Sequence, residues 1–224
     1  MNTFAGGNVV PNAKPVTLGN FNTVRRNLEN ILPAGIAIFP IGSAGHKEIS
    51  KDLDVLIDAT ALSTHFLTTS IKDSKKKLEE YFVNLGYFSK RTGVSVHVGI
   101  PTGEGTDVTQ VDIMVVENAE EIWPLHVHDY TSPNTKGGTL HAMWADLANL
   151  TSILNHSKLM ISPYKGLLDR NTRELISSDK NTIASIIVSE DATKDDLSSV
   201  GRILKLLPTD SEKYNLIYSK YYKT

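Results

Sequence analysis

Two aspartates one residue apart, Asp52 and Asp54, stand at the start of the apolar run 55–57. Aspartate is depleted in β-strands, and successive side chains of a strand point to opposite faces. Asp52 and Asp54 are therefore predicted to point the same way, while Leu53, Val55 and Ile57 face a core on the other side. Two carboxylates this close repel each other, and burial strengthens the repulsion. A divalent cation such as Mg²⁺, which prefers oxygen ligands, resolves the conflict.

A third carboxylate, Asp112, lies in the apolar segment 108–116. Val111, Ile113 and Val115 share one face of the predicted strand, so Asp112 lies on the other face. An aspartate in such a place destabilises the fold unless it is paired or metal-bound. If this strand lies beside the strand of Asp52 and Asp54, three carboxylates converge. Such a group can hold two metal ions about 4 Å apart, which clamp the attacking and leaving oxygens of a phosphoryl transfer.

The dipeptide Gly42-Ser43 follows the predicted strand 36–41. Backbone N–H groups and a serine hydroxyl at such a turn can receive phosphate oxygens. His46 and Lys47 follow and add positive charge for the same anion. We therefore expect a metal-bound nucleoside triphosphate here. The alternative interpretation treats the two aspartates as solubilising charges of an edge strand and Gly-Ser as a simple turn.

The elements that position these residues follow from hydrophobic periodicity. Residues 20–120 are predicted to form a mixed α/β core, with Gly103 and Gly105 in a hairpin turn. On this hairpin, His97 is expected to be a half-exposed structural residue. The predicted elements are, in order, a helix over 20–32, strands over 36–41 and 52–57, helices over 59–67 and 74–85, and strands over 94–100 and 108–116.

The pattern changes after Glu117, and the remainder of the chain is predicted to be mainly helical. We expect a helix over 139–156, two short strands around the turn 169–171, and three helices that start near residues 178, 193 and 209, the last with a capping box of Thr209 and Glu212. The predicted fold class is α+β, a small mixed sheet with helices followed by a mainly helical part. The predicted regions are an extended N-terminal arm (1–19), the core (20–120) and a helical region (121–224).

Composition narrows the classes of function. The chain has no cysteine, which excludes disulfides, thiolate metal sites and a cysteine nucleophile. A net charge of −2 differs from the basic surplus of a strong nucleic-acid binder. The first residues do not have the pattern of a signal peptide, and no apolar run has the length of a membrane span. We therefore expect a cytoplasmic protein with no membrane partner.

The order Gly42-Ser43, Asp52-Leu53-Asp54 and Val111-Asp112-Ile113 resembles the DNA polymerase beta-like nucleotidyltransferase superfamily. The resemblance implies a palm-like core that binds an NTP or dNTP with two Mg²⁺ ions, for which Mn²⁺ can substitute. It also implies that Asp52 and Asp54 bind both metals. Asp112 would bind the catalytic metal and help to activate the attacking hydroxyl, and Ser43 would contact the triphosphate.

A second segment, 137–188, resembles the thumb of family X polymerases, with Gly138 and Thr139 in place of the nucleotide-contacting turn. This resemblance favours a nucleic-acid 3′ end as acceptor. The arginines expected after Gly-Ser are absent, and His46 and Lys47 stand in their place. Transfer to a tRNA, a protein or a small molecule is the alternative, and a degenerate, non-catalytic module for binding or assembly is another.

One further pattern could bind a metal. His126, His128 and Asp129 form an H-x-H sequence with a neighbouring carboxylate, which suits a transition metal. No third partner stands at a fixed spacing, so we expect these to be surface or loop-packing residues.

Overall fold

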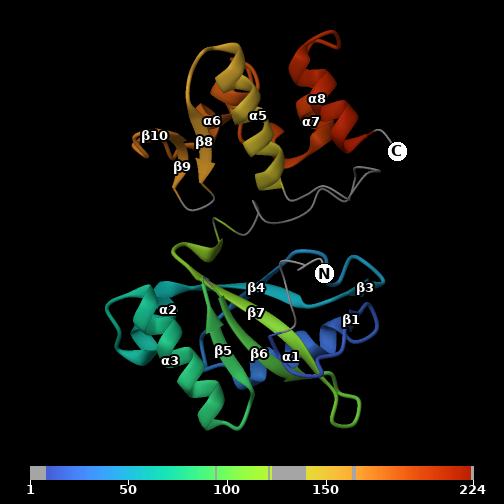
Figure 1. Cartoon of the computed structure of the whole chain (residues 1–224), viewed down its shortest axis with the longest axis vertical. Coiled ribbons are helices and arrows are strands. Elements are labelled where there is room, and N and C mark those ends of the chain that lie inside the picture. The colour runs from blue at the N-terminus through green and yellow to red at the C-terminus, as the bar shows by residue number, and fades with distance from the viewer. Residues whose placement is uncertain (1–8, 94, 121, 123–139, 163–164, 223–224) are drawn as a thin grey trace, which may run out of the picture. The chain divides into compact units, whose positions relative to one another are not determined.

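The computed structural model describes residues 9–93, 95–120, 122, 140–162 and 165–222 (Figure 1). The chain divides into two compact units, Met1–Trp123 and Pro124–Thr224. The sequence had predicted a boundary between residues 120 and 121. Each unit contains its own cluster of buried apolar side chains.

The first unit is built on a five-stranded sheet with the strand order β2-β4-β7-β6-β5. The central strands β4 and β7 are parallel, and every other neighbouring pair is antiparallel. The predicted α+β class with a small mixed sheet is therefore confirmed. The strands are β2 (Ile38–Ile41), β4 (Leu53–Asp58), β5 (Ser89–Thr92), β6 (Ser95–Pro101) and β7 (Val108–Val116).

Three helices pack against this sheet, α1 (Phe21–Ile31), α2 (Ala59–Phe66) and α3 (Ile71–Asn84) (Figure 1). Their buried side chains form one cluster with alternate residues of β4 and β7. Leu53, Val55 and Ile57 belong to this cluster, as their spacing predicted. The helix α3 begins at residue 71 rather than 74, because Ser70 caps it by accepting a hydrogen bond from Asp73 N.

The N-terminal arm, from residue 9 onward, is attached to the first unit. Strand β1 (Val16–Thr17) pairs with β3 (Ile49–Ser50) in a two-stranded antiparallel ribbon. Val10 is fully buried, and Lys14 N donates to Val108 O of β7 at 2.8 Å. The arm is therefore part of the fold beside β7.

The second unit is mainly helical and also contains a small antiparallel sheet. Its sheet has the order β10-β9-β8, so there are three strands where two were predicted. Its last helix is capped by Ser211, which accepts from Tyr214 N, and the predicted capping box on Thr209 is wrong. The elements are α5 (Leu140–Leu154), β8 (Leu159–Ser162), β9 (Gly166–Asp169), β10 (Leu175–Ser177), α6 (Lys180–Ile187), the 3₁₀ turn η2 (Asp196–Ser198), α7 (Val200–Leu206) and α8 (Glu212–Tyr221).

Within these described residues, no helix is both long and apolar enough to cross a membrane.

Candidate functional site

Asp54 and Asp112 lie directly opposite each other on the adjacent parallel strands β4 and β7. Their strand neighbours belong to the core under the helices, so both aspartates are on the other face of the sheet. Asp52 immediately precedes β4, and all three aspartates are half-buried. The structure thus brings the three predicted carboxylates to one end of the β4–β7 pair.

The electrostatics of these carboxylates are unfavourable without a cation. Burial raises the pKa of Asp54 to about 7, and the charges of Asp52 and Asp112 contribute. Burial also raises the pKa of Asp52, with a further contribution from Asp112. A carboxylate is stabilised by a nearby positive charge. The cluster is therefore suited to attract either protons or a cation.

Gly42 brings the backbone of the β2–β3 turn against the carboxylate of Asp54. Its φ is +73°, and a Cβ atom built on it would lie 2.8 Å from Asp54 Oδ2. Glycine adopts this left-handed conformation at little energetic expense, and here it also avoids a steric clash. The turn predicted to receive a polyphosphate is thus next to one of the predicted metal ligands.

The rest of this turn is held by internal hydrogen bonds. Ser43 Oγ lies 2.9 Å from Ser50 Oγ of β3. The backbone N–H groups of His46 and Lys47 donate to Ser43 O at 3.2 and 3.0 Å. The side chains of His46 and Lys47 are exposed. These two residues could therefore contribute side-chain charge to an anion, while their N–H groups are used within the turn.

His97 is a site residue that the sequence prediction missed. It is 7% exposed, so the expectation that it is half-exposed is wrong. His97 lies on β6, directly across from Asp112 of β7, and its Nδ1 lies 2.6 Å from Asp112 Oδ1. Its Nε2 contacts Thr92 Oγ1. The sequence pattern gives the face of His97 but not the register of β6 against β7, which pairs it with Asp112.

Gln110, two residues before Asp112 on β7, was also missed. It is 2% exposed, and its Nε2 donates to Asp112 Oδ1 at 2.9 Å. A buried amide on a strand face carries no clear signal in the sequence, because the arm that contacts its oxygen is about 100 residues away in the chain.

The chemistry of the three aspartates fits a hard divalent cation, since every candidate ligand is a carboxylate oxygen. Burial and the repulsion between the carboxylates disfavour the charged forms of Asp52 and Asp54. A bound cation would therefore stabilise these charged forms. Among the described residues, however, no three His, Asp or Glu side chains are gathered closely enough to form a metal-binding group. In this arrangement one oxygen of Asp112 accepts hydrogen bonds from His97 and Gln110.

The remaining candidates from the sequence lie outside the described residues. These are Gly138 and Thr139 of the predicted nucleotide-contacting turn, and His126, His128 and Asp129 of the H-x-H pattern.

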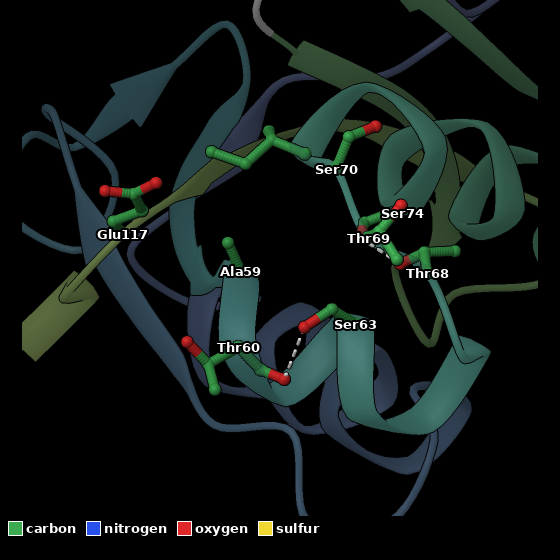
Figure 2. A pocket seen from close by; sticks show the side chains of 9 residues that line it. Ala59, Thr60, Ser63, Thr68, Thr69, Ser70, Ser74 and Glu117 are labelled. Atoms are coloured by element: carbon green, nitrogen blue, oxygen red, sulfur yellow. Dashed lines mark hydrogen bonds between the residues drawn. The ribbon is translucent and has the colours of Figure 1, made fainter.

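A separate cavity of about 280 Å³ lies where β4 and β7 end, in contact with Ala59 of α2 and Glu117. Figure 2 shows hydroxyl-bearing side chains of α2 and of the turn into α3 around it. Ala59 is five residues beyond Asp54, a separation of about 16 Å along a strand at roughly 3.3 Å per residue. The cavity is therefore at the opposite end of β4 from the aspartates.

Comparisons with known proteins give little further information. No protein-family model matches the chain, and no curated protein matches its sequence. Among solved structures 54 chains match. One of them is described under "Structural Basis for the Activity of a Cytoplasmic RNA Terminal U-transferase". It has 17% sequence identity and a TM-score of 0.26, and the match covers 68% of this chain and 41% of that chain.

Proposed function

We propose that the chain is a metal-dependent nucleotidyltransferase of the DNA polymerase beta-like superfamily. It would transfer a nucleoside monophosphate from an NTP or dNTP to an acceptor hydroxyl and release pyrophosphate. The observation that supports this proposal is the pairing of Asp54 with Asp112 across adjacent parallel strands, with Asp52 and the Gly42 turn beside them. In this proposal residues 20–120 form the palm-like core and 121–224 the thumb-like region.

The roles of the residues follow from their chemistry. Asp52, Asp54 and Asp112 would hold two Mg²⁺ ions, or Mn²⁺ in their place. Such ions neutralise the triphosphate and stabilise the attacking and leaving oxygens. The Gly42-Ser43 turn would position the triphosphate, with the Ser43 hydroxyl donating to a phosphate oxygen. Asp112 would orient the acceptor hydroxyl and take its proton, while the hydroxyl oxygen attacks the α-phosphorus and the bond to pyrophosphate breaks. Catalysis would then depend on positioning and charge neutralisation.

A labelling experiment tests this proposal. The protein is incubated with Mg²⁺ or Mn²⁺ and each NTP or dNTP labelled at the α-phosphate, with a DNA primer, an RNA, a tRNA or no added acceptor. We expect label on one acceptor and a matching release of pyrophosphate, with a nucleic-acid 3′ end as the first expectation. Label on tRNA, on the protein itself or on a small molecule would support the alternative acceptors.

The matched control is Asp112→Asn, which keeps the shape of the side chain and removes its charge. We expect it to abolish turnover, by at least about 100-fold, while circular dichroism and thermal unfolding show an intact fold. Full activity in Asp112→Asn would mean that the site is misplaced. Absence of both label and pyrophosphate release in the unsubstituted protein would contradict the enzymatic proposal.

The second candidate is a non-catalytic module that retains this fold for binding or assembly. It is favoured by the absence of a gathered three-ligand metal group among the described residues. Calorimetric titration with Mg²⁺ and nucleotide distinguishes the two. A protein without metal-dependent affinity for nucleotides would favour the module, whereas metal-dependent binding with turnover would exclude it.

A further inference from the structure

We infer that His97 and Gln110 are positioning residues that fix one oxygen of the Asp112 carboxylate and leave the other for the ligand of the site. The inference rests on the proposed function, in which Asp112 binds a metal ion and orients the acceptor hydroxyl. It adds two buried side chains and the N-terminal arm to the candidate site.

The orientation of the Gln110 amide is determined by the arm. Val9 N and Val10 N lie 2.7 and 3.0 Å from Gln110 Oε1. A backbone N–H can only donate, so the oxygen of the amide has to face these two groups. The NH₂ group therefore faces Asp112 Oδ1, to which it donates at 2.9 Å. The arm thus acts through Gln110 on the carboxylate.

The donor nitrogen of His97 follows from the same geometry. Nδ1 lies 2.6 Å from Asp112 Oδ1, the oxygen that also accepts from Gln110, and is placed to donate to it. The other ring nitrogen, Nε2, contacts the Thr92 hydroxyl, which can donate or accept. The ring is buried between Thr92 and Asp112 and presents a donor to the carboxylate.

Both donors converge on the same oxygen of Asp112. Oδ1 accepts from His97 and Gln110, whereas no described residue donates a hydrogen bond to Oδ2. Hydrogen bonds to one oxygen fix the plane of a carboxylate, and partners of this kind orient the groups that ligate metals. Oδ2 is consequently the oxygen available to a metal ion or to the acceptor hydroxyl.

The first test is a nuclear magnetic resonance measurement at neutral pH, which does not require activity. The ¹⁵N shifts of His97 should show a protonated Nδ1, and the side-chain NH₂ of Gln110 should exchange slowly with solvent. Both signals should change in Asp112→Asn. A His97 ring protonated at Nε2 alone, or a fast-exchanging Gln110 amide, would overturn the inference.

The second test separates positioning from a general loss of structure. His97→Leu and Gln110→Met should each lower kcat by about 10- to 100-fold and leave KM for the nucleotide within about threefold. His97→Asn, whose side-chain NH₂ can replace Nδ1 as donor, should recover most of kcat. Unchanged kcat in both His97→Leu and Gln110→Met would overturn the inference, as would equal losses in His97→Asn and His97→Leu.

The matched control is Thr109→Val. Thr109 precedes Gln110 on β7, is fully buried, and donates from Oγ1 to Lys14 O of the arm at 2.7 Å. The substitution removes a bond between the same strand and the same arm without touching Asp112. We expect kcat to stay within about threefold of the unsubstituted protein, and a loss as large as that of Gln110→Met would assign the effect to a loosened arm.

Failure of the proposed function can be told apart from failure of this inference. If the unsubstituted protein transfers no label, Mn²⁺ alone serves as the probe, with free Mn²⁺ measured by electron paramagnetic resonance. His97→Leu and Gln110→Met should then weaken Mn²⁺ affinity by about 10- to 100-fold, with recovery in His97→Asn. Equal Mn²⁺ affinity in all these proteins would overturn the inference.

Discussion

At the scale of single residues, Asp54 is placed where an aspartate destabilises the metal-free fold. Its carboxylate is half-buried, contacts the Gly42 turn and shares one end of the sheet with two other carboxylates. Proteins break local rules of this kind mainly at functional sites. The same residue should therefore reduce stability and enable binding, and the two effects can be measured separately.

Asp54→Asn is expected to stabilise the metal-free protein at pH 8. Burial and the neighbouring charges raise the pKa of Asp54 from 3.8 to about 7 in the folded protein. Folding therefore takes up a proton between these values, and the metal-free fold loses stability as the pH rises from about 4 to about 7. Urea unfolding in a chelator should show a gain of at least about 1.4 kcal/mol in Asp54→Asn at pH 8, the equivalent of one pKa unit.

Mg²⁺ provides the control for this prediction. It should raise the unfolding temperature of the unsubstituted protein at pH 8 and have little effect on Asp54→Asn, because a bound ligand stabilises only the state that binds it. At pH 4 the two proteins should differ little in the chelator. A loss of stability in Asp54→Asn at pH 8 without metal would contradict the prediction.

Gly42→Ala should damage the site as well as the fold. The new methyl group would lie 2.8 Å from Asp54 Oδ2 in a backbone with φ +73°. Gly86→Ala is a matched control, since Gly86 has φ +87° and a methyl group added there would have nothing within 4 Å. Both substitutions should reduce stability by about 1 kcal/mol or more through backbone strain. Only Gly42→Ala should also weaken Mn²⁺ binding, measured by calorimetry, and equal affinities would show that this contact is unimportant.

The acidic residues of the site could be predicted from the sequence, but their partners could not. Asp52, Asp54 and Asp112 are recognisable because each interrupts or borders an apolar strand, which is a local pattern. His97 and Gln110 act through contacts set by strand register and by the distant arm. A sequence pattern with a period of two gives the face of a residue but not its neighbour across the sheet.

At the scale of elements, the parallel pair β4–β7 positions the site, and Asp58 stabilises its far end. Asp58 ends β4 and caps α2, accepting from Thr60 N at 2.8 Å and Ala61 N at 3.3 Å. Its second oxygen accepts from Ala119 N, just after β7, at 3.2 Å. One side chain thus links the end of β4, the start of α2 and the segment after β7.

Asp58→Ala is expected to destabilise the protein by about 1–2 kcal/mol at pH 7, the range for loss of a helix cap. Partial burial raises the pKa of Asp58, but hydrogen bonds from Ala119, Thr60 and Ala61 outweigh it and hold the pKa below its ordinary value. The stabilisation is therefore present above the unfolded pKa and is lost as the pH falls through the folded pKa. Urea unfolding should show the difference at pH 7 and a smaller one near pH 3.

Asp58→Asn is the control, because asparagine also caps helices. It should retain most of the stability at pH 7 and lose the dependence on pH. If Asp58→Ala destabilised the protein equally at both values of pH, the charge of Asp58 would have no part in holding the end of β4.

The type of most elements could be predicted, and their ends less well. Helical spacing predicted α1 and α5, and the apolar segments 94–100 and 108–116 predicted β6 and β7, although β6 is buried on both faces. One strand of the second unit's sheet escaped prediction, because the segment before the predicted turn at 169–171 contains two strands, β8 and β9, which pair with each other. The cap of α8 is Ser211 rather than Thr209, because Ser211 Oγ accepts a hydrogen bond from Tyr214 N at 3.1 Å.

At the scale of the whole molecule, each hydrophobic cluster of the described residues draws its members from one unit. The two clusters of the first unit lie within residues 16–122, and that of the second within 143–221. A unit with its own core can unfold as a separate cooperative step. We therefore expect the chain to unfold in two transitions, of which only the first unit's should respond to Mg²⁺.

Paired core substitutions assign the two transitions. Leu28 of α1 and Leu147 of α5 are both fully buried, each in the cluster of its own unit. Replacing either by alanine should destabilise its own unit by about 2–5 kcal/mol, the sum of lost burial and cavity formation. Scanning calorimetry should show Leu28→Ala lowering the Mg²⁺-responsive transition and Leu147→Ala lowering the other, with the unaffected transition shifted by less than about 0.5 kcal/mol. A single transition that both substitutions lower equally would mean that the units fold as one, and the second unit would then contribute to the stability of the site.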